Sequence, residues 1–470
     1  MGRVIPIIIC VDIEPDERAI DPHERKDWPG FEETWKYLAR MRPALELATK
    51  SPARFNWYLR MDPQISRAYG SAGWAATRYR EFFAEMRAAQ DEIGLHPHAW
   101  RWDEPEQKWI SDFANQEWIE RCVRQSFAEF EDCFKKPCRS VRFGDRWFNN
   151  QTVELVERLG ARFDLTIEPG RKPQRLPESF TGSLPDYTSA PRRHYRPSRS
   201  DFLQPGGLFS RRKLWMIPVS TASLDWAVLP VRSISGETSH DNAAYEGWLD
   251  QVDQRWIAGW VYDAGRPDET ICVDVYDNDN LLGRYAADVF RSDLLLAGKG
   301  SGAHGFYIPI PKEKIDGNSH RISVKVSGAD FELVNSPREI IWNDAQARDD
   351  FWTMNLSENS GLFRRLFDSL IYEQQVSHLA FVVRTDAVLH REHLAYLERN
   401  FDYILSHPLA GNFAVTTAAE AIGILRSDIR SNFLMARRAS GKIFQCVKQQ
   451  MARIRQRDDG EITSERRSKD

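Results

Sequence analysis

The sequence has little cysteine and no long hydrophobic run, and each absence argues against a class of protein. Its six cysteines, at positions 10, 122, 133, 138, 272 and 446, form no CxxC pair and no zinc-ribbon spacing. In a chain of 470 residues this pattern predicts reduced thiols rather than a disulfide scaffold. No stretch approaches the roughly 18 apolar residues that a membrane span needs, and the apolar part of the N-terminus is too short for a signal peptide. We therefore expect a soluble, cytoplasmic protein with no transmembrane segment.

Neither sign of charge dominates. The chain has 64 Lys and Arg against 68 Asp and Glu, a formal net charge of −4, so its charge gives no indication of a nucleic-acid partner. Its length exceeds the ~250–300 residues at which single cores stop growing. The residue in excess is tryptophan, with 16 copies. Flat rings stack on sugars, but large cores also use tryptophan, so the excess favours sugar binding only weakly.

Apolar strands alternate with helices over the first 170 residues. Strands are expected at 4–11, 53–59, 92–95, 140–143 and 162–166, and helices at 31–50, 74–90, 116–134 and 149–159. This alternation predicts parallel strands joined by helical crossovers. Polar residues follow each strand, and in a β/α barrel they converge on one face. These residues are Asp12, Arg60, Asp62, His96, His98, Arg142, Asp145 and Asp164.

The pattern changes after Gly170. Residues 171–212 are expected to form a long surface segment, and residues 245–341 have the short alternating stretches and Gly/Asp turns of an all-β sandwich. Helices at 361–373, 393–400 and 417–425 then alternate with strands at 378–383 and 412–416. We expect an α/β protein in which a distorted (β/α) barrel, residues 1–235 and 350–428, is interrupted by an inserted all-β sandwich domain, residues 244–343. A basic helical tail, partly disordered, is expected at 431–470. This tail either stays in solvent or packs on the rest of the protein, or it contacts an acidic membrane surface.

The segment from Asp91 to Trp100, DEIGLHPHAW, carries the sharpest local signal. His96 and His98 stand two residues apart in an extended chain, so their side chains point the same way. Imidazole is a preferred ligand of zinc and similar ions, and a carboxylate from another strand end would complete an open site. Asp12 and Glu14 are the natural suppliers. The competing interpretation is a surface loop with two histidines.

The ordered set of motifs resembles the polysaccharide deacetylase family, in the nodulation-factor deacetylase homology domain of carbohydrate esterases. The matching segments are Cys10–Glu14 (CVDIE), Glu92–Trp100 (EIGLHPHAW), Val141–Trp147 (VRFGDRW), Phe163–Gly170 (FDLTIEPG), Tyr195–Ser198 (YRPS), Trp215–Ser220 (WMIPVS) and His378–Asp386 (HLAFVVRTD). The resemblance extends over most of residues 1–230 and 350–425. No single segment is specific, and their order and spacing carry the resemblance.

The resemblance implies a metal-dependent hydrolase that removes acetyl groups from a carbohydrate, acting on carbon–nitrogen amide bonds that are not peptide bonds. The cofactor would be a divalent metal ion, with Zn²⁺ expected. The ligands implied are His96 and His98, the base is Asp12, Arg142 orients that base, and Asp164 is a supporting carboxylate. Trp100, Trp147, Tyr195 and Arg384 are expected to contact the substrate.

The chain departs from the family pattern in three places. The family's histidine motif usually separates its histidines by three residues, which would put Trp100 where a ligand is expected, so His98 must ligate by a different route. Ile13 stands where a second aspartate is usual, so either Glu14 supplies the missing ligand or Asp12 ligates and another residue is the base. The last barrel strand ends in Arg384 instead of bringing a histidine, which leaves the proton donor unassigned, with His390 as a candidate. A catalytically impaired glycan-binding or scaffolding relative is therefore the alternative, and hydrolysis of a different amide stays open.

The predicted sandwich has a resemblance of its own. Segments at 247–253, 257–263 and 302–309 are similar to a small β-sandwich found beside bacterial glycosyltransferases. This resemblance implies a place in bacterial surface-polysaccharide metabolism. The expected partners are a carbohydrate substrate and other enzymes of polysaccharide biosynthesis.

Overall fold

The structure is a computed structural model that describes residues 3–173, 178–224, 244–344, 350–373 and 376–427. The predicted tail at 431–470 and the predicted boundary at residue 235 lie outside the described residues. Among the described residues, no helix is long and apolar enough to cross a membrane.

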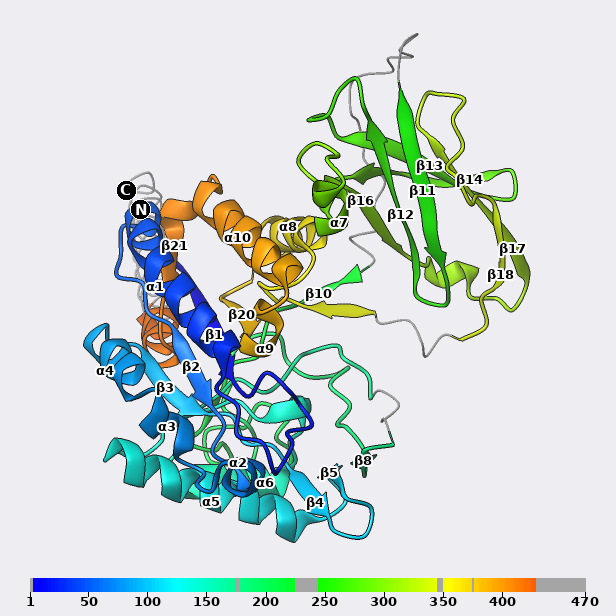
Figure 1. Cartoon of the computed structure of the whole chain (residues 1–470). Coiled ribbons are helices and arrows are strands. Elements are labelled where there is room, and N and C mark those ends of the chain that lie inside the picture. Colours follow the sequence, from blue (N-terminus) through cyan, green and yellow to red (C-terminus); the bar gives the residue numbers. More distant parts are fainter. Residues whose placement is uncertain (1–2, 174–177, 225–243, 345–349, 374–375, 428–470) are drawn as a thin grey trace, which may run out of the picture.

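A curled sheet of parallel strands forms the centre of the molecule (Figure 1). The strand order is β20-β1-β2-β3-β6-β7-β9, and β21 pairs with the first residues of β1. The strands are β1 (Ile5–Ile13), β2 (Asn56–Leu59), β3 (Glu92–Leu95), β6 (Ser140–Val141), β7 (Phe163–Asp164), β9 (Trp215–Met216), β20 (Leu379–Arg384) and β21 (Phe413–Val415). Every pair in this sheet is parallel, which confirms the predicted strand arrangement.

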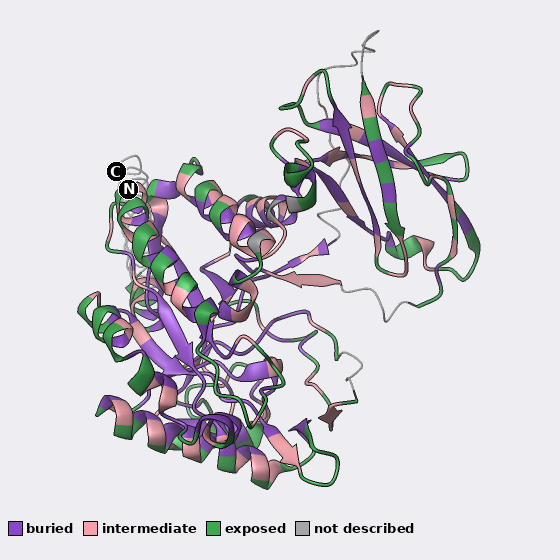
Figure 2. Ribbon diagram, viewed as in Figure 1, coloured by how far each residue is buried: buried purple, intermediate pink, exposed green. Residues whose placement is uncertain are grey.

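The β1 strand shows how this sheet has two buried faces. Ile7 and Ile9 belong to the large cluster beneath the helices, whereas Ile8 and Cys10 belong to a small cluster inside the curl. Successive side chains of a strand point to opposite faces, which explains why β1 is apolar without alternation. Figure 2 shows the resulting buried strands and the exposed outer surfaces of the helices around them.

The segment at Val219 and Ser220 connects two distant strands of the curled sheet, which makes the sheet a partial barrel. The N–H of Val219 donates to the carbonyl of Ile167 (2.9 Å), while the N–H of the next residue, Ser220, donates to the carbonyl of Ala380 in β20 (2.9 Å). These bonds connect the β7 side of the sheet to β20. A helix over residues 418–427 covers the opposite end, where Ala418 and Ile422 pack in one cluster with Ile8.

The helices lie outside the sheet. They are α1 (Pro29–Thr49), α2 (Pro63–Tyr69), α3 (Trp74–Arg78), α4 (Arg80–Ala88), α5 (Gln116–Phe134), α6 (Asn150–Arg158), α8 (Ser360–Asp368), α9 (Thr385–Val388) and α10 (Arg391–Ser406). The prediction of a single helix at 74–90 is wrong, because the helix is interrupted at Tyr79. The hydroxyl of this residue accepts the N–H of Trp28 (2.6 Å), and its ring meets the ring of Phe31 edge-on. A tertiary contact therefore outweighs helical periodicity here.

Residues 245–341 form two four-stranded antiparallel sheets, here called the two-sheet unit. One sheet has the order β11 (Tyr245–Val252), β12 (Trp256–Asp263), β16 (Ala303–Pro309) and β15 (Val289–Phe290); the other has β14 (Asn280–Ala287), β13 (Ile271–Asp277), β17 (Ser319–Val326) and β18 (Arg338–Ile341). Inward side chains of both sheets share one apolar cluster. The predicted domain boundaries stay predictions.

Short elements surround the partial barrel and join it to the two-sheet unit. The hairpin β4 (Trp100–Asp103) and β5 (Lys108–Asp112) pairs with β8 (Phe180–Thr181). The strands β10 (Thr221–Ser223) and β19 (Phe351–Thr353) pair between the barrel and the two-sheet unit (Figure 1). In the two-sheet unit, the short helix α7 (Ser292–Leu296) contacts α10, and β15 contacts α8.

Candidate metal-binding active site

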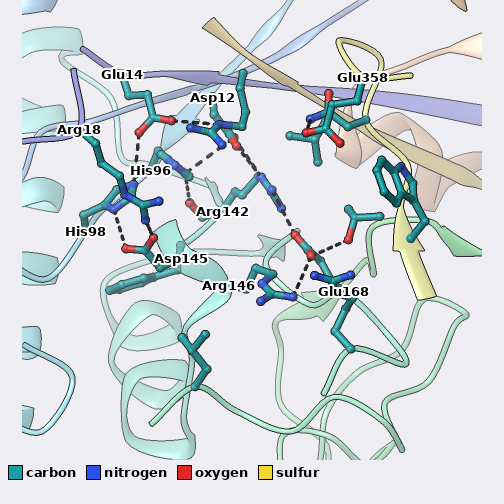
Figure 3. Close-up of a pocket in the computed structure, with 18 of the residues that line it drawn as sticks. Asp12, Glu14, Arg18, His96, His98, Arg142, Asp145, Arg146, Glu168 and Glu358 are labelled. Carbon is teal, nitrogen blue, oxygen red and sulfur yellow. Dashed lines mark hydrogen bonds and ion pairs between the residues drawn. The ribbon is translucent and has the colours of Figure 1, made fainter. Parts of the chain in front are cut away.

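Polar side chains from the ends of β1, β3 and β6 line a cavity of about 500 Å³. Asp12 and Glu14 continue the inward register of Cys10 in β1, because residues of one parity share a face. His96 follows β3 and Arg142 follows β6, and both line the same cavity (Figure 3). Of the eight residues predicted to converge, five line this cavity and three do not. The five are Asp12, His96, His98, Arg142 and Asp145, and the three are Arg60, Asp62 and Asp164.

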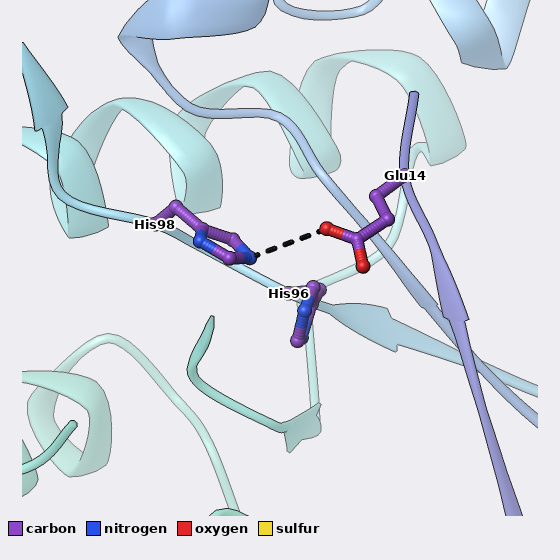
Figure 4. Close-up of side chains that lie close together, drawn as sticks. All are labelled: Glu14, His96 and His98. Atoms are coloured by element: carbon purple, nitrogen blue, oxygen red, sulfur yellow. Dashed lines mark ion pairs between the residues drawn. The ribbon is translucent and has the colours of Figure 1, made fainter. Parts of the chain in front are cut away.

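Glu14, His96 and His98 form a buried group that could hold a metal ion (Figure 4). One ligand atom from each residue lies within 4.8 Å of the others, and Oε2 of Glu14 lies 3.6 Å from Nε2 of His98. Two imidazoles and one carboxylate are a donor set that binds zinc and leaves a coordination position open. Asp12 is not part of this group, although its Oδ1 lies 3.7 Å from Nδ1 of His96.

The second nitrogen of each imidazole already has a partner. Nδ1 of His96 lies 2.7 Å from the carbonyl oxygen of Arg142, and Nδ1 of His98 lies 3.1 Å from a carboxylate oxygen of Asp145. Both contacts place the proton on Nδ1 and leave the Nε2 lone pair for a ligand, as partners of metal-bound histidines do. Within the described part of the chain, the buried Nε2 of His98 has no hydrogen-bond partner.

Burial keeps these imidazoles neutral and ready to bind a metal ion. It lowers the pKa of His96 to about 4 and holds the pKa of His98 well below its ordinary value. Removal from water also raises the pKa of Glu14, whereas the nearby His96 and Arg384 lower it. Neutral imidazoles beside a carboxylate satisfy the protonation states that metal binding requires.

Asp12 and Arg142 form a buried pair beside the histidines. The Nε–H of Arg142 is shared between the two Asp12 oxygens, at 3.0 and 3.1 Å, and its Nη1 donates to the carbonyl of Leu165 at 2.8 Å. Burial raises the pKa of Asp12 to about 6, while the charge of Arg142 and its hydrogen bonds oppose that rise. The structure thus contains the contact between Asp12 and Arg142, and their roles as base and orienting residue stay predictions.

The loop that carries His98 is held from two sides. Its N–H donates to a carboxylate oxygen of Asp62 at 3.2 Å, and that carboxylate is paired with Arg60 in full burial. On the other side Gly144 presses against the imidazole, since a Cβ built on this glycine would lie 2.2 Å from Nε2. The His98 ring therefore has little room to move.

The remaining predicted site residues lie in different places. Arg384 lines the cavity, with its Nε 3.8 Å from Glu14. Asp164 is buried and accepts the N–H and hydroxyl of Thr166, so it shapes the turn after β7 rather than lining the cavity. Trp100, Trp147 and Tyr195 are buried against other rings or bonded to backbone, outside the cavity lining. Their contact with a substrate stays a prediction.

Several residues that line the cavity were not predicted from the sequence. Glu168 contacts Arg142 and Arg146 at 3.6 Å each, and it could have been found, because it follows Asp164 and Thr166 at even spacing after β7. Arg18, which pairs with Asp145, lies on an irregular segment and gave no signal. Arg255 and Trp352 come from the two-sheet unit and β19, far from the motifs in sequence.

Comparison with family models and with curated proteins finds no match. Among solved structures, the chain is similar to a proposed polysaccharide deacetylase from Mycobacterium smegmatis, with 10% identity, 91% of this chain and 92% of that chain covered, and a TM-score of 0.36. It is also similar to a proposed polysaccharide deacetylase involved in O-antigen biosynthesis from Bordetella bronchiseptica (12% identity, 45% and 57% covered, TM-score 0.19). A third is IcaB from Ammonifex degensii (15% identity, 38% and 91% covered, TM-score 0.20). TM-scores this low carry no argument about function, so the function must be argued from the chemistry of the site.

Proposed function

We propose that the protein is a metal-dependent hydrolase that removes acetyl groups from a carbohydrate, an N-acetyl sugar of a polysaccharide or of its precursor. One observation carries the proposal: the buried group of Glu14, His96 and His98 lies in the same cavity as the Asp12–Arg142 pair. The ordered motifs of the sequence support an acetylated sugar as the substrate class.

The donor set fits a divalent ion, because both imidazoles are neutral, Nε2 of His98 lies 3.6 Å from the carboxylate of Glu14, and one ligand atom of each of the three residues lies within 4.8 Å of the others. A divalent ion such as Zn²⁺ there would supply a Lewis acid that activates water and polarises the acetyl carbonyl. Asp145 and the carbonyl of Arg142 hold the two histidines in the tautomer that ligation needs.

Asp12 is the group that takes the proton of the attacking water. Its two oxygens face the Nε–H of Arg142, which fixes the carboxylate plane and favours its charged form. A pKa of about 6 suits a general base near neutral pH, since the base is ionised there and still accepts protons well.

Acetate release tests this proposal. Zinc-loaded protein is expected to release acetate from N-acetylated oligosaccharides, and Asp12→Asn is expected to reduce the rate at least about 100-fold, the typical contribution of general base catalysis. Equal rates in the two proteins would refute the assigned role. No acetate release with glycan binding retained would instead favour the alternative, a catalytically impaired glycan-binding or scaffolding protein.

Metal content provides a separate readout. The purified protein is expected to bind one equivalent of zinc, and His96→Ala is expected to lose it. The matched control is His23→Ala, which removes an exposed histidine outside the cavity. A His96→Ala protein that keeps its zinc would show that the ion lies elsewhere.

A further inference from the structure

The cavity wall includes one residue from the two-sheet unit. Arg255, in the turn between β11 and β12, lines the cavity together with Trp352, Asn355 and Glu358 from the segment that follows the unit. Figure 3 shows Glu358 and Glu168 on the side of the cavity away from Glu14 and His98. Trp352 adjoins Thr353, whose hydroxyl donates to Glu168 at 2.7 Å. This wall therefore belongs to the part of the cavity farther from the histidines.

The turn that carries Arg255 has a fixed backbone. A carboxylate oxygen of Asp253 accepts the N–H groups of Arg255 (2.7 Å) and Trp256 (2.8 Å). The carbonyl of Asp253 accepts the indole N–H of the buried Trp342 at 2.8 Å, and the carbonyl of Arg255 accepts the N–H of Ile310 at 3.2 Å. A side chain on such a turn projects in a defined direction.

An aromatic contact holds this turn against the barrel. The rings of Trp256 and Trp352 meet edge to face, with centroids 6.0 Å apart and planes at 78°. Trp256 also packs against the large apolar cluster of the barrel, and edge-to-face pairs of this kind are stabilised beyond their buried area. Arg255 thus reaches the cavity because its neighbour is anchored to the wall of that cavity.

The charges of the lining favour an anion. Among the described residues, six arginines line the cavity against five carboxylates, so arginine is in excess by one. The six are Arg18, Arg142, Arg146, Arg171, Arg255 and Arg384. Clefts lined by an excess of one sign concentrate ligands of the opposite sign. A guanidinium also matches the two oxygens of a carboxylate or phosphate in geometry as well as in charge.

We propose that Arg255 forms, with the cavity wall around Trp352, a subsite for an anionic group of the substrate, a carboxylate or a phosphate. The two-sheet unit thereby takes part in substrate selection. The inference rests on the proposed function, because it places the anion on the same molecule that carries the acetyl group. The anionic group lies on the part of the substrate away from the acetyl carbon.

Three N-acetylated probes separate the possibilities. Tetra-N-acetylchitotetraose is neutral, a hyaluronan tetrasaccharide carries carboxylates, and UDP-N-acetylglucosamine carries phosphates. Binding is measured by titration calorimetry with zinc-loaded protein. We expect at least one anionic probe to bind about tenfold or more tightly than the neutral probe, and the preferred probe identifies the anion. The preference is expected to weaken as ionic strength rises, because exposed charges are screened.

Arg255→Gln is the decisive variant, and Arg321→Gln is its matched control. Both arginines are exposed on the two-sheet unit, but only Arg255 lines the cavity. We expect Arg255→Gln to bind the anionic probe about tenfold more weakly with neutral-probe binding unchanged, and Arg321→Gln to match the wild type. An absent anionic preference, or a preference that survives in Arg255→Gln, would overturn the subsite. Failure of acetate release with an intact Arg255-dependent preference would refute the hydrolase and leave the anion subsite standing.

Discussion

Gly144→Ala is expected to disable the metal site through a contact of one methyl group. The added Cβ would lie 2.2, 2.3 and 2.4 Å from three atoms of the His98 ring, where ordinary contact begins at 3.4 Å. The ring must therefore retreat by about 1.2 Å, unless the glycine itself moves. Gly144 is held by its N–H, which donates to the carbonyl of Pro97 at 2.9 Å.

A displacement of this size is large on the scale of metal coordination. Zinc–nitrogen distances fall near 2.0–2.1 Å, and working sites keep them within about 0.2 Å. We expect zinc affinity to fall at least 10- to 100-fold, which corresponds to about 1.4–2.7 kcal/mol. Competition with a chromophoric chelator measures the loss, and the spectrum of a cobalt-substituted protein reports the change in coordination.

The control for this prediction is Gly411→Ala. A Cβ on Gly411 would meet nothing within 4 Å, so this variant is expected to bind zinc like the wild type. Far-ultraviolet circular dichroism establishes that both variants are folded. Wild-type zinc affinity in a folded Gly144→Ala protein would refute the assignment of His98 as a ligand.

Three further predictions follow from single contacts. Asp145→Asn removes the charge at Nδ1 of His98 and is expected to weaken zinc binding 10- to 100-fold; the exposed Asp132→Asn should leave it unchanged under the same chelator competition. Arg142→Lys keeps a positive charge but cannot bond Asp12 and the Leu165 carbonyl in the same geometry, so acetate release should fall about tenfold or more at full zinc content, and an undiminished rate would contradict the orienting role. Burial lowers the pKa of His378 to about 4, so the unfolded chain takes up a proton between pH 6.5 and 4 that the folded protein does not, and stability falls on the order of 3 kcal/mol as the pH drops through that window. Urea unfolding of His378→Gln at pH 7.5 and 4.5 should show a smaller fall than the wild type; an identical fall would place the acid sensitivity on other groups.

Local periodicity was sufficient to predict the helices and strands whose packing agrees with it. The α5 helix begins and ends where its apolar spacing predicts, at Gln116 and Phe134. The β1 strand was equally clear, because a run of Ile and Val buried on both faces has no competing interpretation at that length. Where tertiary contacts oppose periodicity, as at Tyr79, the prediction failed.

In the candidate site, too, the sequence predicts some features and leaves others undecided. Asp12, Glu14, His96 and His98 could be proposed from strand ends, because parallel strands bring their carboxyl ends together. The sequence could not decide whether Asp12 or Glu14 is the carboxylate beside the histidines, since both point inward from one strand. In the structure Asp12 pairs with Arg142 and also lies 3.7 Å from Nδ1 of His96, whereas Glu14 lies 3.6 Å from Nε2 of His98.

The sequence by itself determined the alternation of strands and helices and the parity that turns polar residues inward, because both depend on neighbours a few positions apart. Only the tertiary structure decided which of those residues meet. Asp145 reaches His98 across 47 positions, and Arg142 reaches Asp12 across 130. The turn that carries Arg255 joins the cavity because Trp256 packs on Trp352. Such contacts arise from the curling of the sheet and the packing of distant segments, which local periodicity does not encode.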